Sequence, residues 1–169
     1  MPFYLKERDT SAELLNIRSV LIVPCRFCPA ATFAVRENKP FIDVFRTFLR
    51  TAVYESYIRS LKERLENKRI RVNVFESRVP NQFIACMWTS GRRRKLKELA
   101  ATYDAVIVLG CDAAVRTVED SIGSASKVIP GMEIEGIMNV IPSVQFPFTI
   151  YLRMSGLIRV IRDPADIVS

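Results

Sequence analysis

The residues of this chain whose types and spacing best suit chemistry are its four cysteines. Cys25 and Cys28 form a Cys-x-x-Cys pair, and Cys86 and Cys111 follow as single residues. A Cys-x-x-Cys loop lets two thiolates point at one ion, as in many zinc and iron–sulfur sites. The chain has no histidine, which excludes Ser-His-Asp and Cys-His catalysis and every metal site that needs a histidine ligand.

Two of these cysteines directly follow predicted buried strands. The apolar run 19–23 leads through a proline to Cys25, and the apolar run 104–110 leads to Cys111. The carboxyl ends of parallel strands lie along one edge of a sheet, where ligands usually bind. We therefore expect these two thiols to meet at that edge. Cys86 joins them if its segment folds over the edge.

Four kinds of site remain open for these thiols. The first expectation is an iron–sulfur cluster, of the 4Fe–4S type, and the second choice is structural zinc, because thiolates serve both. A third is a redox dithiol at Cys25 and Cys28, joined by Cys111, whose pKa a helix N-terminus would lower. The fourth is a set of unlinked core cysteines, which suits Cys86 in the run IACMW best. A domain of this length folds without a metal staple, which favours a functional metal centre.

The surrounding pattern predicts an α/β fold. The strands 19–23, 69–76, 104–110 and 127–129 alternate with helices at 41–68, 92–102 and 112–122, and residues 25–40 form a loop. This order indicates a mostly parallel sheet with helices on both faces, a flavodoxin- or Rossmann-like arrangement of three layers. Thr89 or Ser90 is the expected N-cap of the second helix, and Asp112 caps the third, which Gly123 ends.

The last part of the chain predicts antiparallel strands. The segments 134–141, 146–154 and 157–162 are extended, and Ser155-Gly156 is the expected turn of a C-terminal hairpin. The whole chain is interpreted as one domain, 1–169, with an N-terminal arm (1–17, including a short helix near 12–15), an α/β core (18–130) and a β tail (131–169). The tail is apolar, so we expect it to be buried in a homodimer or in a larger protein complex.

The net charge of +7 favours an acidic protein surface as partner, with nucleic acid a weaker alternative. The densest basic run, 92–95, follows a Thr-Ser-Gly sequence and resembles a phosphate-binding helix start, so Arg92, Arg93 and Lys95 are candidate nucleotide- or phosphate-binding residues. The spacing of a P-loop is missing. Charged residues and prolines interrupt the apolar stretches, and the N-terminus lacks a signal core, so we expect a cytoplasmic protein without membrane insertion.

Two segments resemble small cysteine-rich α/β proteins of anaerobic metabolism. The stretch VPCRFCP and the stretch YDAVIVLGCDAAVRTVED are similar to segments of the delta subunit of methyl-viologen-reducing hydrogenases and of the cysteine-rich partner of methylenetetrahydrofolate reductase. The resemblance covers about 20–28 and 103–120. It implies that Cys25, Cys28, Cys86 and Cys111 ligate an iron–sulfur cluster in an accessory subunit of one-carbon metabolism or methanogenesis. Further cysteines of both groups, and the Gly-Pro-Cys-Gly-Gly motif of the reductase partner, are missing here.

The leading hypothesis is therefore a non-catalytic, accessory metal protein with a four-cysteine site, serving electron transfer or oxygen and redox sensing in a larger anaerobic complex. The alternative from the enzyme class is a nucleotide- or phosphate-binding α/β enzyme that uses the same strand edge and the basic run 92–95, with Cys111 as nucleophile or core residue. A metal-free scaffold subunit is the third hypothesis.

Overall fold

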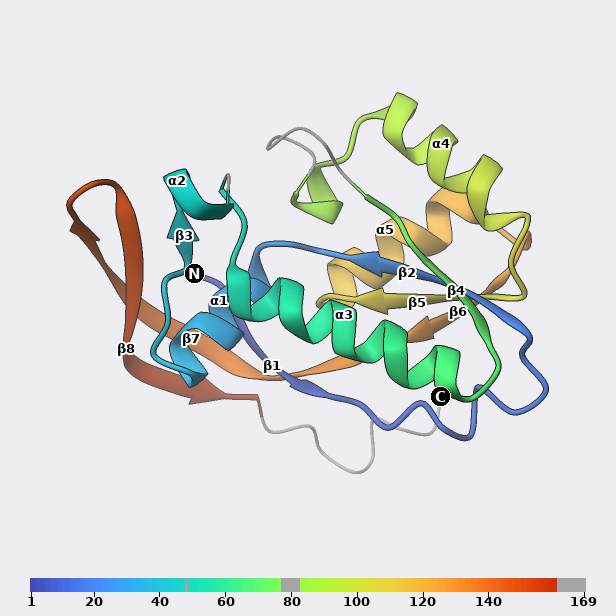
Figure 1. The fold of residues 1–169 in the computed structure, drawn as a ribbon, viewed down its shortest axis with the longest axis horizontal. Coiled ribbons are helices and arrows are strands. Elements are labelled where there is room, and N and C mark those ends of the chain that lie inside the picture. The colour runs from blue at the N-terminus through green and yellow to red at the C-terminus, as the bar shows by residue number, and fades with distance from the viewer. Residues whose placement is uncertain (48, 77–82, 161–169) are drawn as a thin grey trace.

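The computed structural model describes residues 1–47, 49–76 and 83–160. Within these residues the chain forms a mixed α/β structure with one parallel and one antiparallel sheet (Figure 1). The parallel sheet has the strand order β4-β2-β5-β6, and the antiparallel sheet has the order β1-β7-β8-β3. The prediction of an α/β fold with a parallel core and an antiparallel C-terminal part is thereby confirmed.

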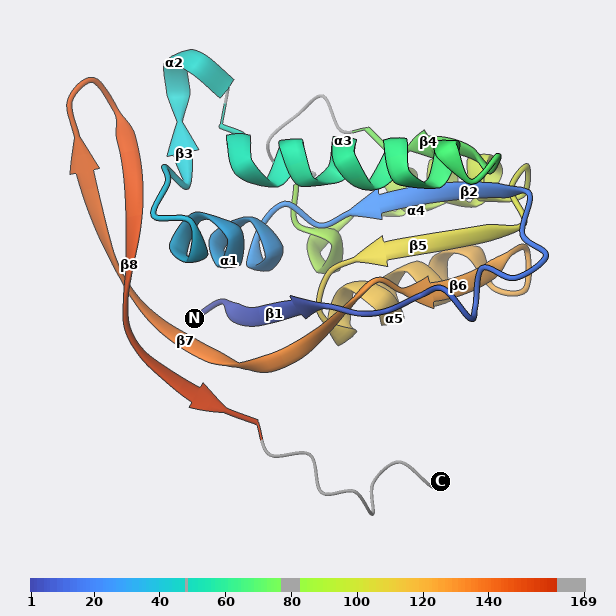
Figure 2. The same ribbon diagram turned by 60° about the horizontal axis from the view of Figure 1, so that its bottom comes forward.

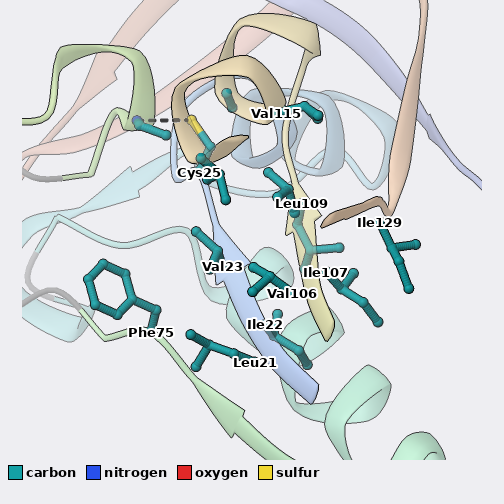
Figure 3. Close-up of a cluster of buried hydrophobic side chains, with 14 of the residues drawn as sticks. Leu21, Ile22, Val23, Cys25, Phe75, Val106, Ile107, Leu109, Val115 and Ile129 are labelled. Atoms are coloured by element: carbon teal, nitrogen blue, oxygen red, sulfur yellow. Dashed lines mark hydrogen bonds between the residues drawn. The ribbon is translucent and has the colours of Figure 1, made fainter. Parts of the chain in front are cut away.

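The parallel sheet contains the most deeply buried strands. Its members are β2 (Ser19–Pro24), β4 (Arg71–Val74), β5 (Ala105–Leu109) and β6 (Lys127–Pro130). Every residue of β2 and β5 is buried, and Figure 3 shows their aliphatic side chains packed together. Each such Val, Ile or Leu contributes roughly 1.5–3 kcal/mol through burial, which explains why the sequence runs without polar alternation here.

Three helices connect the parallel strands. They are α3 (Ala52–Asn67), α4 (Ser90–Ala100) and α5 (Asp112–Ile122). The hydroxyl of Tyr54, on α3, donates to the carbonyl oxygen of Leu109 at 3.3 Å, so α3 is fixed over the end of β5. Helix α4 packs against α5. Gly123, with φ of 58°, ends α5 as predicted.

The prediction of one helix over 41–68 is wrong in its first third. That stretch forms β3 (Ile42–Asp43) and the short helix α2 (Val44–Thr47) before α3 begins. Leu49 has a positive φ of 68°, a left-handed conformation that a continuing helix excludes. Thr51 then takes extended backbone angles as the N-cap of α3, and its hydroxyl donates to the Phe41 carbonyl oxygen. The apolar periodicity therefore spans three separate elements, β3, α2 and α3.

The predicted loop 25–40 instead contains helix α1 (Cys28–Arg36). Pro29 lies in the first turn of α1, where a helix needs no backbone N–H and tolerates proline. The small residues that follow are buried against the core. The consequence is that Cys28 stands at the start of a helix.

The second sheet joins the N-terminal arm to the tail. Strand β1 (Phe3–Glu7) pairs antiparallel with β7 (Met132–Gln145), which pairs with β8 (Thr149–Arg159). The predicted short helix near 12–15 is a series of turns.

The position of the predicted hairpin turn is also wrong. The chain turns at 146–148, and Gly156 pairs with Asn139 inside the hairpin. Next to that pair, Met154 faces Val140, so Ser155 is an extra residue of β8. Such a β-bulge keeps the strand continuous while it accommodates residues that would otherwise make a turn. The far half of the hairpin projects from the parallel sheet (Figures 1 and 2).

Candidate thiol site at the sheet edge

The cysteines gather where the strand order of the parallel sheet reverses. From β2 the chain moves to β4 on one side, and then crosses to β5 on the other side of β2. Cys25 directly follows β2, and its backbone N–H donates to the Leu109 carbonyl oxygen at 2.9 Å. Cys111 follows β5 after one glycine. Because open α/β sheets bind ligands outside such a reversal point, the predicted meeting of these two cysteines occurs at the edge expected of a site.

The glycine between β5 and Cys111 keeps this edge compact. A Cβ atom at Gly110 would lie 2.6 Å from the Ala114 Cβ atom and 3.2 Å from the Cys25 Cβ atom. The first distance is far below ordinary van der Waals contact, so a larger residue would push α5 away from β2. Gly110 thus sets how closely Cys111 and Cys25 approach.

Cys25 is a buried thiol that accepts backbone hydrogen bonds. Its residue surface is 3% exposed, and the Ala85 N–H donates to its sulfur at 3.5 Å (dashed in Figure 3). Burial raises the pKa of Cys25 to about 11, against the smaller opposing effect of backbone hydrogen bonds. Cys25 is therefore protonated at neutral pH.

The segment that carries Cys86 does fold over the edge. The Arg26 N–H donates to the Phe83 carbonyl oxygen at 2.7 Å, and the 3-10 turn Ala85–Met87 lies beside Cys25. Cys86 itself is exposed. It lies close enough to Cys25 to contribute to the raised pKa of that thiol.

Cys28 and Cys111 are in direct contact. Cys28 opens α1 and is half-buried, whereas Cys111 is the N-cap of α5 and is 6% exposed. The hydrogen bond from the Cys28 thiol is the main reason that the pKa of Cys111 falls to about 6, helped by backbone N–H groups of α5 that include that of Ala114. The same hydrogen bond, and then burial, raise the pKa of Cys28. At neutral pH the pair therefore holds one proton, on Cys28.

Asp112 was predicted to cap α5, but Cys111 occupies the N-cap position and Asp112 is the first helical residue. The partial positive charge at the N-terminus of α5 consequently stabilises the Cys111 thiolate, because this end of a helix favours an anion.

The four thiols form one electrostatically connected group. Cys111 and Cys86 both contribute to the raised pKa of Cys25, and Cys25 and Cys111 both contribute to that of Cys28. Among the residues that the structure describes, however, no three Cys, Asp or Glu side chains are arranged to hold a metal ion. The sulfurs are neighbours, but they do not have the spacing of ligands around a single ion.

The sequence interpretation missed Arg26, which fastens the Cys-x-x-Cys loop. Its side chain is 3% exposed, and its Nε atom lies 2.6 Å from a carboxylate oxygen of Glu55, on α3. Its Nη2 atom lies 3.3 Å from Glu76, which also binds Arg50. The available signal was a charged residue directly after a fully apolar strand, which must find a partner when it is buried.

The basic run divides into a buried and an exposed part. The guanidinium carbon of Arg92 lies 3.8 Å from the centre of the Phe75 ring and 5.5 Å from that of Trp88, and Arg92 is buried. Its backbone N–H donates to the hydroxyl of Thr89, which is the N-cap of α4. Arg93 is half-buried and donates from Nε to the Trp88 carbonyl oxygen, whereas Lys95 is exposed. The three predicted phosphate ligands therefore lie in different environments.

A separate cleft lies beside the N-terminal arm. A cavity of about 600 Å³ separates the N-terminal arm from α3, over Ile107 and Leu109 of β5. Its rim mixes both signs of charge, including Arg8, Asp9 and Arg64, and the four cysteines are absent from its described lining. The assignment of the thiol site therefore rests on the residue types and on their position in the sheet, and not on this cleft.

No protein-family model, curated protein or solved structure matches the chain. Within the described part of the chain, no helix combines the length and apolar character needed to cross a membrane. The fold and the site define the class that can be stated: an α/β protein with four grouped thiols at the carboxyl edge of a parallel sheet.

Proposed function

We propose that this chain is an accessory redox protein whose four cysteines together bind a metal centre, in first place an iron–sulfur cluster of the 4Fe–4S type. One observation carries this proposal. Thiols from three separate segments of the chain form one connected group at the reversal point of the sheet. Unlinked core cysteines would have no reason to share this edge.

The buried core favours a cluster over zinc, because a domain with such a core needs no structural metal. In a tetrahedral zinc site with Zn–S bonds of about 2.3 Å, the sulfurs lie about 3.8 Å apart. A cluster distributes its cysteine ligands over several iron atoms and accepts thiols that stand further apart. The described residues contain no set of three ligands suited to one ion, which supports neither group, and zinc stays the second choice. When bound, a cluster would supply one-electron transfer, and Cys25, Cys28, Cys86 and Cys111 would hold it.

The surroundings of Cys86 support transfer to or from a partner. Cys86 and its neighbour Met87, which is 69% exposed, reach the surface, and the exposed side chains of Arg94 and Lys95 follow on α4. A surface of this kind suits an acidic protein partner. We propose a role in electron transfer or redox sensing within a larger cytoplasmic complex; its anaerobic one-carbon or methanogenic nature follows only from the resemblance of the two cysteine segments.

The finer fold assignment is part of the same proposal. Numbered along the chain, the parallel strands have the order 2-1-3-4, which is the beginning of the flavodoxin-like order. Right-handed crossovers to opposite sides of β2 would place α3 and α4 on opposite faces. We infer a three-layer arrangement that is extended by the antiparallel sheet.

The phosphate-binding enzyme is the weaker alternative. The guanidinium of Arg92 packs against two aromatic rings, so Arg93 and Lys95 are the remaining candidate ligands. A shift of the melting temperature on adding nucleotides or inorganic phosphate would favour this alternative. The metal-free scaffold would be favoured by free thiols and no response to either ligand.

The deciding experiment measures iron, zinc, acid-labile sulfide and the absorbance spectrum of protein purified without oxygen. Iron and sulfide together are expected, and each Cys→Ser variant should lose most of both. Ala113→Ser is the matched control, because it places the same hydroxyl on the exposed face of α5. Zinc alone would turn the site into a structural one. Absence of metal, or full metal content in Cys86→Ser with loss in Cys25→Ser, would overturn the four-cysteine centre.

A further inference from the structure

The Cys-x-x-Cys motif suggests that Cys25 and Cys28 are redox partners, but the structure pairs Cys28 with Cys111 instead. We propose that Cys28 and Cys111 form a reversible disulfide in the metal-free protein, and that this bond, rather than one within the Cys-x-x-Cys loop, is the oxidised state of the site. The observation is the direct contact of the two thiols at the starts of α1 and α5.

Cys25 is held away from such a bond by its own contacts. Its sulfur accepts hydrogen bonds from the Ala85 and Phe27 N–H groups, and its backbone N–H is tied to β5. Helix α1 begins at Cys28, so Cys25 lies outside the helix. A bond between Cys25 and Cys28 would have to break these hydrogen bonds, whereas a bond between Cys28 and Cys111 replaces one thiol–thiol contact by another.

Exposure determines the order of the steps with a small disulfide, RSSR, as oxidant. Cys28 is half-exposed and Cys111 is buried, so the Cys28 thiol passes its proton to the Cys111 sulfur, and the Cys28 sulfur then attacks one sulfur of RSSR and RS⁻ leaves. The Cys111 sulfur, already in contact, then attacks the Cys28 sulfur of the mixed disulfide, and the second RS⁻ leaves. The one proton of the pair goes from Cys111 to the first RS⁻, and the second RS⁻ takes its proton from water. Two protein thiols are oxidised, and one RSSR is reduced to two RSH.

The disulfide would also control the metal centre. This consequence rests on the proposed function: the bond removes two of the four ligands, so oxidised protein cannot assemble the centre until it is reduced. The disulfide itself requires no metal and is testable alone.

Arg26 makes the linkage easy to map. Trypsin cleaves after Arg26 and so separates Cys25, in residues 19–26, from Cys28, in residues 27–36, while Cys111 falls in residues 98–116. The protein would be the full-length Cys86→Ser variant, which removes the exposed thiol, freed of metal with a chelator and treated with oxidised glutathione. Peptides would be identified by mass spectrometry without reduction.

The expected product is the linked pair of 27–36 and 98–116, which dithiothreitol separates. Adding Cys25→Ser should leave this product unchanged, whereas adding Cys111→Ser should abolish it and leave one glutathione on Cys28. A dominant link between 19–26 and 27–36, or a glutathione that stays on Cys28 when Cys111 is present, would overturn the proposal. Both results are read in the Cys86→Ser chain itself, independently of how the other variants fold.

Metal analysis of the untreated wild-type chain separates this proposal from the proposed function. A Cys28–Cys111 link in a chain that never binds metal would support the disulfide proposal and contradict the proposed metal centre. A metal-binding chain that forms only the link between Cys25 and Cys28 would support the proposed metal centre and contradict the proposal of a Cys28–Cys111 disulfide.

Discussion

The buried guanidinium of Arg26 is bound at 2.6 Å to the carboxylate of Glu55, and this ion pair fastens the loop between Cys25 and Cys28 to helix α3. A buried charge that loses its partner is costly, because neither water nor the more distant carboxylate of Glu76 fully replaces the lost interaction. The positions of Cys25 and Cys28 therefore depend on the ion pair of Arg26 and Glu55. Within the described part of the chain, the hydrogen bonds of this pair join guanidinium and carboxylate atoms, and not a sulfur.

Replacing Arg26 with Gln should destabilise the fold by about 3 kcal/mol, since it leaves Glu55 without its closest cation. For a chain of this length that corresponds to a fall in melting temperature of roughly 6–12 °C, measurable by calorimetry. The matched control is Lys62→Gln, which removes the exposed pair with Glu66 and should cost less than about 1 kcal/mol. Equal melting temperatures for the two variants would show that the Arg26 pair does not hold the loop.

Gly110→Ala should destabilise the protein by about 1–3 kcal/mol, because the added Cβ atom overlaps Ala114 and crowds Cys25. Gly91→Ala is the control: it adds the same methyl group to a helix, with nothing within 4 Å, and should stabilise by up to about 1 kcal/mol. Chemical denaturation of both variants gives the two differences. A neutral effect at Gly110 would mean that β5 and α5 adjust without strain.

Alkylation of Cys111 in reduced, metal-free Cys86→Ser protein should follow a thiolate with a pKa of about 6. The rate constant, measured by mass spectrometry against pH, should level off above about pH 7. Cys28→Ala removes the hydrogen bond that is the main cause, so the midpoint should move to higher pH. An unmoved midpoint would assign the lowered pKa to the helix N-terminus alone.

Stability should change with pH through the same pair. Folding lowers the pKa of Cys111 from 9.0 to about 6, so its stabilising contribution grows as the pH rises from about 6 toward 9 and is lost as the pH falls through 6. Above pH 9 the unfolded chain also releases the protons of Cys25 and Cys28, whose pKa values folding raises, and stability declines. Urea unfolding at pH 5.5 and 8.5 should show a smaller pH dependence in Cys28→Ala than in the wild type.

Phe146→Ser should leave the folding stability within about 0.5 kcal/mol of the wild type, since this side chain is 96% exposed. If the projecting hairpin lies in a homodimer or larger complex, the variant should lose association in light-scattering or co-purification measurements. Ser143→Ala, on the same hairpin, is the control that should keep it. Unchanged association in Phe146→Ser would place the interface elsewhere.

Local patterns predicted much of the parallel core. The continuous apolar runs of β2 and β5 identify strands buried on both faces, and Gly123 ends α5 because a positive φ suits glycine. Parallel topology then brings Cys25 and Cys111 to one edge without knowledge of any contact. These features depend on residues near one another in the chain, or on a rule that holds for every parallel sheet.

Other features were decided by contacts that no local pattern contains. The left-handed Leu49 divides an apparently continuous helical pattern, and the bulge at Ser155 moves the hairpin turn to 146–148. Cys28 meets Cys111, and not its sequence neighbour Cys25, because α1 starts at Cys28 and points it toward the N-terminus of α5. Spacing along the chain determined which residues carry the chemistry. The packing of two distant helices on one sheet edge decided which thiols share a proton, since that depends on distances across the fold.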